Sequence, residues 1–214
     1  MNRGRAPWIG ALVAIVSLGA TSCLRGTGTA TAPTDWSQYL GGPLHSSVSS
    51  TTTVTKLNAG ALHAKWVFHA AAATMTGQPA PSFVSSPTVS GGRVFIGSNS
   101  GVFYALDEAT GSVVWQHFLG FEPKLTCGNI GLSSTAAVAP DPVSGLPTVY
   151  VSGGDGHLYA FDAATGNQNW TSVIALRSAT VNDYYDWSSP TVTGGRIYIG
   201  VTSECDVPLV RGGV

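Results

Sequence analysis

An eleven-residue pattern occurs twice in the chain and constrains the fold more than any other feature. "ALDEATGSVVW" spans residues 105–115 and "AFDAATGNQNW" spans 160–170, so both fit A-x-D-x-x-T-G-x-x-x-W at an offset of 55 residues. A second repeat frames them, because "SSPTVSGGRVFIG" at 85–97 returns as "SSPTVTGGRIYIG" at 188–200. Self-similarity at a fixed period is typical of repeat architectures, in which one supersecondary unit recurs along the chain.

Each unit is predicted to contain four short strands separated by tight turns. Glycine supplies the positive φ that tight hairpin turns need, and alternating apolar residues place side chains on opposite faces of a strand. The second unit has a looser first part at 134–152 and a turn at Gly154-Asp155-Gly156. Such units in series predict an all-β chain, a β-propeller of four-stranded antiparallel blades. In the first unit the expected strands are 86–89, 93–97, 102–106 and 112–118, with turns at Gly91-Gly92 and Asn99-Ser100-Gly101.

The repeated pattern is interpreted as structural, with one role for each kind of residue. The aspartates should bond the backbone N–H groups of the turn between the third and fourth strands, and the glycines let that turn close. The alanines stay small so that a neighbouring blade's aromatic ring can lie against them, and the tryptophans supply that ring. The residues of this docking motif are Ala105, Asp107, Thr110, Gly111 and Trp115, and again Ala160, Asp162, Thr165, Gly166 and Trp170.

The motif resembles the tryptophan-docking motif of the pyrroloquinoline-quinone (PQQ) type propellers, the quinoprotein alcohol dehydrogenase-like superfamily. That superfamily contains quinoprotein alcohol dehydrogenases and also cofactor-free propellers, such as the lipoprotein scaffold of outer-membrane barrel assembly. Residues 35–70 resemble the lead-in of such proteins, with Trp66 placed like Trp115 in an isolated outer strand. We therefore expect about 2.5 blades plus that leading strand, an incomplete ring from the N-terminal part of a longer protein, because propellers have 4–8 blades.

The N-terminus predicts export. Residues 1–22 read as a signal peptide, with Arg3 and Arg5 before an apolar core at 8–19 that is short for a membrane span. Cys23 stands where a bacterial lipoprotein is lipidated, so lipid anchoring toward the periplasm or cell exterior is favoured over plain secretion or an uncleaved anchor. Residues 23–34 suit a flexible linker or lipid tether, and 35–214 form the partial propeller.

Three cysteines are present in the chain. If Cys23 carries lipid, then Cys127 and Cys205 are left as a pair in an oxidising compartment, where disulfides persist. Both precede or follow strands of neighbouring units, so a disulfide between them is predicted. The alternative is two separate thiols.

Charge argues against a nucleic-acid partner. The formal net charge is −1 and charged residues make up 10% of the chain, with no basic cluster. The expected partners are a protein or a small molecule at the propeller face, with the membrane reached only through the lipid anchor.

Two stretches could carry function. Asp183, Tyr184, Tyr185, Asp186 and Trp187 precede the third unit and could stack on and hydrogen-bond a sugar, a peptide or a quinone, or else pack between blades. The resemblance to quinoprotein dehydrogenases implies PQQ and Ca²⁺, and Glu204 lies in a stretch broadly similar to the one that carries their Ca²⁺-binding glutamate. A solvated loop carboxylate is the alternative for Glu204, and the adjacent cysteine pair of those enzymes is missing from the sequence.

Two hypotheses follow from the sequence. One is an exported, lipid-anchored PQQ-like propeller that acts as a binding or assembly scaffold, with no catalytic residue assigned in this chain. The other is the N-terminal part of a PQQ- and Ca²⁺-dependent dehydrogenase of alcohols or polyols, in which Glu204 contributes to the metal site.

Overall fold

The structure is a computed structural model that describes residues 35–49, 53–122, 128–175, 184–203, 206 and 209–214. Its regular elements are strands and two three-residue 3-10 turns, η1 (Tyr39–Gly41) and η2 (Ala59–Ala61). The all-β prediction is confirmed. Among the described residues, no helix is long and apolar enough to cross a membrane. The predicted signal peptide, Cys23 and the linker at 23–34 lie outside the described residues.

Two antiparallel four-stranded sheets form the complete blades, and in each the strands follow one another in sequence order. Turns join consecutive strands of each sheet. The Gly91-Gly92 turn between β1 and β2 has φ values of +58° and +74°, as the two-glycine sequence predicts. The first sheet contains β1 (Thr88–Ser90), β2 (Arg93–Gly97), β3 (Val102–Asp107) and β4 (Val113–Phe118). The second contains β5 (Ala137–Pro140), β6 (Pro147–Ser152), β7 (His157–Asp162) and β8 (Gln168–Val173).

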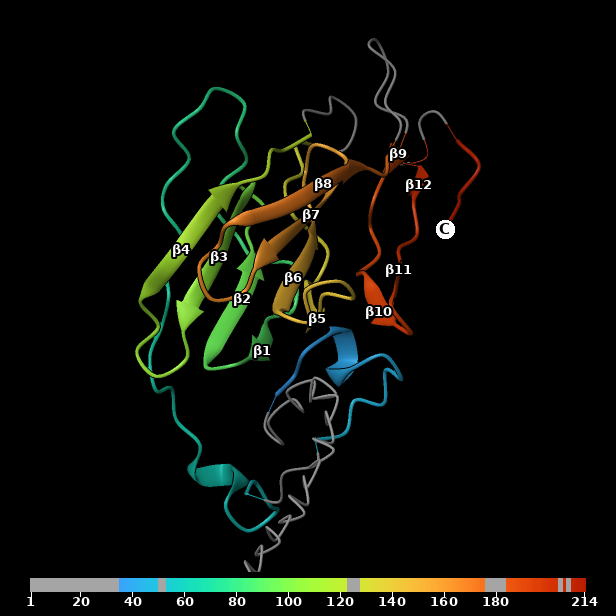
Figure 1. Cartoon of the computed structure of the whole chain (residues 1–214). Helices are drawn as coiled ribbons and strands as arrows, with labels where there is room; N and C mark the ends of the chain where they lie inside the picture. The colour runs from blue at the N-terminus through green and yellow to red at the C-terminus, as the bar shows by residue number, and fades with distance from the viewer. Residues whose placement is uncertain (1–34, 50–52, 123–127, 176–183, 204–205, 207–208) are drawn as a thin grey trace, which may run out of the picture.

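A third unit begins after the second blade. The hairpin of β10 (Thr191–Thr193) and β11 (Arg196–Tyr198) repeats the pairing of β1 with β2, and β9 (Tyr184–Tyr185) pairs with β12 (Thr202–Ser203). The innermost strands β1, β5 and β10 lie next to one another in that order, and Figure 1 shows the sheets fanning outward from them. This arrangement is that of successive propeller blades.

The core lies between the blades rather than within them. The first interblade cluster joins large apolar side chains of β2 and β3 to valines of the second blade, and most of them are fully buried. A second cluster joins the second blade to the β10–β11 hairpin. The first cluster comprises Phe95, Phe103, Ala105, Trp115, Leu119, Leu132, Ala136, Val138, Val149, Val151, Phe161 and Ala163. The second comprises Ala137, Tyr150, Ala160 and Val192, with Ala139, Trp170 and Ile197 packed against it.

A short lead-in segment crosses the inner strands of all three units. Trp36 exchanges two backbone hydrogen bonds with Val89 of β1, at 2.8 and 3.0 Å. The next residue, Ser37, accepts a hydrogen bond from the N–H of Val138 in β5 at 2.7 Å. The Gln38 side chain then donates to the carbonyl of Val192 in β10 at 3.0 Å and accepts from its N–H at 2.9 Å. Residues 36–38 therefore tie the three units together at their inner edge.

The segment around Trp66 differs from the sequence-based expectation. Residues 66–70 are assigned no strand, because no described strand lies alongside to pair their backbone. Their side chains nevertheless pack as an outer strand's would, with Trp66 and Phe68 against the buried Val94, Tyr104 and Leu106 of the first blade.

Gln38 provides a test of the inner-edge contact. The side chain is 3% exposed and is the hydrogen-bonding partner of both backbone groups of Val192. We expect Gln38→Ala to lower the free energy of unfolding by about 2–3 kcal/mol, because buried backbone groups lose their partners. Gln116→Ala, at an exposed position of β4, is the matched control and should change it by less than about 0.5 kcal/mol. Equal effects of the two substitutions in urea denaturation would refute the role of Gln38.

Candidate functional site

The repeated motif builds a docking contact between neighbouring blades. The indole N–H of Trp115 donates to the carbonyl of Ala163 in the next blade at 3.3 Å, and the ring lies over Gly166. A Cβ added at Gly166 would come within 2.7 Å of the ring, closer than real carbon atoms approach. Only glycine fits beneath the ring, so the motif needs this residue for the close approach as well as for its φ of +75°.

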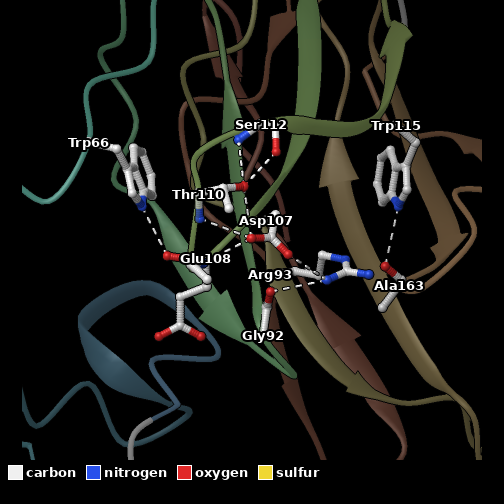
Figure 2. Close-up of polar contacts among 10 residues, drawn as sticks. Trp66, Gly92, Arg93, Asp107, Glu108, Thr110, Ser112, Trp115 and Ala163 are labelled. Atoms are coloured by element: carbon white, nitrogen blue, oxygen red, sulfur yellow. Dashed lines mark hydrogen bonds and ion pairs between the residues drawn. The ribbon is translucent and has the colours of Figure 1, made fainter.

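The same contact occurs at the first blade. Trp66 donates its indole N–H to the carbonyl of Glu108 at 2.9 Å and lies 2.6 Å from a Cβ built at Gly111. Figure 2 shows the two indoles, each directed at the carbonyl of the residue that follows the motif aspartate. In both contacts the glycine lies beneath the ring, whereas the sequence analysis expected it only to let the turn close.

The alanines of the motif pair with the tryptophans of their own blades. Ala105 lies opposite Trp115 of its own blade across β3 and β4, and Ala160 lies opposite Trp170 in the same way. Both alanines are fully buried. Their small side chains leave room beside the ring of their own blade, and the ring of a neighbouring segment lies over the motif glycine.

The motif aspartates hold the docking turns in shape. Asp107 Oδ1 accepts from the N–H groups of Ala109 and Thr110, at 3.1 and 2.9 Å, and from the Thr110 hydroxyl at 2.9 Å. Asp162 makes the equivalent three bonds in the second blade. These bonds stabilise the ionised carboxylates and lower their pKa values. The largest effect on the pKa of Asp107 is the hydrogen bond from the Thr110 hydroxyl, and the largest on the pKa of Asp162 is the hydrogen bond from the Thr165 N–H. Arg93 adds a 3.6 Å ion pair to Asp107.

His117 adds a contact that the sequence did not reveal. Its ring stacks on Phe161 of the next blade, with centroids 4.6 Å apart and planes 6° from parallel. Its Nε2 lies 2.7 Å from the carbonyl oxygen of Gly166, which can only accept, so the proton is on Nε2. No spacing to another histidine or to the motif signals this role.

The loops at the other end of the blades carry the predicted ligand residues. Tyr185 is 1% exposed, and its hydroxyl donates to the carbonyl of Gly131 in the preceding interblade loop. Trp187 is 44% exposed, packs against Tyr185 with centroids 4.6 Å apart, and donates its N–H to the carbonyl of Ser203 at 3.2 Å. The predicted ligand residues therefore differ in their surroundings. Tyr185 is packed between units, whereas Trp187 lies at the surface and is held there by its contacts with Tyr185 and Ser203.

Two buried carboxylic acids lie in the same loops. Asp186 is 2% exposed, and Glu122, which sequence reasoning did not single out, is 0% exposed and forms a bridge with Ile130. Tyr184 is half-buried in β9. Asp183, Cys127, Glu204 and Cys205 lie outside the described residues, so the predicted disulfide and the proposed metal ligand stay predictions.

A tyrosine–carboxylate pair occupies the turn between β6 and β7. The hydroxyl of Tyr159 donates to Asp155 Oδ2 at 2.6 Å, and the His157 ring lies 3.3 Å from Oδ1. Burial, followed by the bond to Asp155, raises the pKa of Tyr159 well above its usual range. This pair keeps a proton in place rather than releasing one near neutral pH.

Side chains that could ligate a metal ion do not gather in the described part of the chain. Ca²⁺ takes six to eight oxygen ligands, and the described residues contain no group of three His, Cys, Asp or Glu side chains that could hold an ion.

Comparison with known proteins decides the family. The family model PQQ_2, described as outer membrane protein assembly factor BamB, matches residues 28–200. The chain belongs to this PQQ-type repeat family. Its β-propeller fold is shared by a europium-containing methanol dehydrogenase, with a TM-score of 0.60 and 19% identity over 80% of this chain and 28% of that one. A quinohemoprotein alcohol dehydrogenase from Comamonas testosteroni gives a TM-score of 0.54 and 19% identity over 79% and 25%.

Curated sequence relatives of this PQQ-type chain include two dehydrogenases that match just over half of it. Polyvinylalcohol dehydrogenase of Sphingopyxis sp. (strain 113P3) is 31% identical over 54% of this chain. Quinohemoprotein alcohol dehydrogenase ADH-IIG of Pseudomonas putida is 28% identical over 54%. The matches cover 16% and 15% of the two relatives, so the chain spans a small part of their length.

The glycine beneath the docked ring can be tested directly. Gly166→Ala should destabilise the fold by about 2–4 kcal/mol, combining overpacking against Trp115 with the cost of a left-handed alanine. Gly91→Ala is the matched control, because Gly91 also has positive φ but a Cβ there meets nothing within 4 Å. It should cost only about 1–2 kcal/mol. Urea denaturation of both variants measures the difference, and an equal cost would show that the ring does not select for glycine.

Proposed function

We propose that this chain forms blades of an exported, lipid-anchored PQQ-type propeller that acts as a binding and assembly scaffold. The observation that carries the proposal is Trp187, a half-exposed ring fixed by its bond to Ser203 and by its packing on the buried Tyr185. A rigid aromatic surface of this kind binds partners with little loss of side-chain entropy. The description of the matching family as an assembly factor supports a protein partner.

A second function is favoured by a different observation. Both polyvinylalcohol dehydrogenase and quinohemoprotein alcohol dehydrogenase are sequence relatives. In this alternative the protein oxidises alcohols or polyols with PQQ and Ca²⁺. Glu204 would then be a metal ligand, the aromatic surface would face the quinone, and the remaining ligands would come from other parts of the protein.

One experiment separates the two functions on the whole protein that carries this chain. The purified protein is incubated with PQQ and CaCl₂, and bound quinone absorbance and dye-linked oxidation of ethanol and polyvinyl alcohol are measured. The scaffold proposal predicts neither bound quinone nor turnover. Turnover that is lost on removing Ca²⁺ would overturn it in favour of the dehydrogenase.

A second readout tests the binding surface itself. A photocrosslinking amino acid is placed at position 187 and, as a control, at the exposed Val113 of β4. In cells of the source organism, position 187 should give a discrete crosslinked protein that position 113 does not give. The same labelling pattern at both positions would contradict a binding role for the Trp187 surface.

A further inference from the structure

One segment of the chain projects beyond the end of the blades. Residues 53–65 contain the 3-10 turn η2 and are named the projecting segment. Figure 1 shows η2 well past the turns that end the sheets, at the opposite end of the molecule from β9 and β12. Asn58 Oδ1 accepts from the Thr55 N–H at 2.7 Å, and the N–H groups of Asn58 and Ala59 donate to the Thr55 carbonyl at 3.2 and 2.9 Å. Local hydrogen bonds therefore shape this turn.

Three aliphatic side chains of the projecting segment lie in solvent. Leu57 is 99% exposed, Leu62 is 67% exposed and Val54 is 53% exposed. Exposed apolar side chains are common singly, but several on one short projection are typical of a surface that contacts another apolar phase. Covering them is favourable in proportion to the apolar area removed from water.

The blades hold the chain on either side of the projecting segment. Gln38 bonds Val192 at the inner edge before the segment begins, and Trp66 bonds the Glu108 carbonyl and covers Gly111 directly after it ends. Packing of the chain on the first blade starts at Trp66, whereas η2 lies beyond the turns of the sheets (Figure 1). A further blade beside Trp66 would therefore meet the chain from that residue onward, and the exposed side chains before it need a different partner.

Charge complementarity identifies that partner. Lys56 and Lys65 lie in the projecting segment, and no aspartate or glutamate occurs between Asp35 and Asp107. Residues 107–214 carry ten acidic and four basic side chains, so the sign of the charge differs between the two parts of the sequence. Such asymmetry is typical of chains that meet nucleic acid or a membrane. Exposed leucines beside lysines fit the membrane, because aliphatic groups enter the acyl boundary while ammonium groups reach the lipid phosphates.

We propose that the projecting segment is a contact site for the surface of an anionic lipid bilayer. Val54, Leu57 and Leu62 insert at the boundary between headgroups and acyl chains, and Lys56 and Lys65 pair with lipid phosphates. The contact turns the opposite end of the blades, with its exposed aromatic loop, away from the membrane. A lipid tether on the same chain would raise the local lipid concentration, so modest affinity is sufficient for this orientation.

The test uses the whole protein that carries this chain, without residues 1–22 and with Cys23→Ala, so that neither the apolar N-terminal core nor an attached lipid contributes. Vesicle flotation measures the bound fraction against lipid concentration. Vesicles of phosphatidylglycerol and phosphatidylethanolamine should bind about tenfold more tightly than phosphatidylcholine vesicles. High salt should remove most of this difference, because it screens the lysines. Equal binding to both kinds of vesicle, or binding to neither, overturns the proposal.

A pair of matched variants locates the contact. Leu57→Asp should weaken binding to the anionic vesicles about tenfold, because it removes an inserted side chain and adds a repelled charge. Val143→Asp makes the same change in charge at a 95% exposed position of the β5–β6 turn, and it should bind as the unaltered protein does. Equal weakening by the two substitutions, or none by Leu57→Asp, contradicts the assignment.

A photocrosslinking amino acid at position 57 identifies the occupant in cells. Lipid adducts support the proposal, whereas a discrete protein adduct overturns it in favour of a protein partner. These readouts do not involve Trp187, so their failure would leave the proposed scaffold function to its own tests.

Discussion

The packing of an indole on a glycine of the next blade is the contact on which the rest of the structure depends. Trp115 and Trp66 each cover a glycine in a neighbouring turn and bond a carbonyl beside it. A blade buries little between its own strands, so its stability comes from the faces that neighbouring blades present to each other. The aspartate bonds keep each turn rigid, and the ring then finds a surface of fixed shape.

At the inner edge of the blades, hydrogen bonds from the lead-in segment connect the three units. Residues 36–38 bond to β1, β5 and β10 in turn, through backbone groups and then through the Gln38 side chain. The lead-in segment thus fixes the order of the inner strands while the tryptophans fix the outer ones. At the other end of the blades, Trp187 is exposed and packs on Tyr185, which is buried between the units.

Sequence reasoning predicted the repeat architecture because spacing and glycine content are local properties. The strands of the first blade were predicted in this way, and β2 has the bounds expected. Contacts between distant segments left no such signal. Gln38 and Val192 are 154 residues apart, His117 meets Phe161 without a motif, and the neighbour of Ala105 depends on strand register. The turn at Asp141 has the same aspartate hydrogen bonds as the motif turns. Sequence reasoning missed it because it has serine where they have threonine, and because it joins the first and second strands of its blade rather than the third and fourth.

The most direct test of the interblade contact is a double-mutant cycle on Trp115 and Gly166. The free energy of unfolding is measured by urea denaturation for the unaltered chain, Trp115→Leu, Gly166→Ala and the double variant. If the ring is what excludes a Cβ at Gly166, the alanine should cost about 1–2 kcal/mol less once the ring is gone. A cost that is the same in both backgrounds, within about 0.5 kcal/mol, would contradict the account.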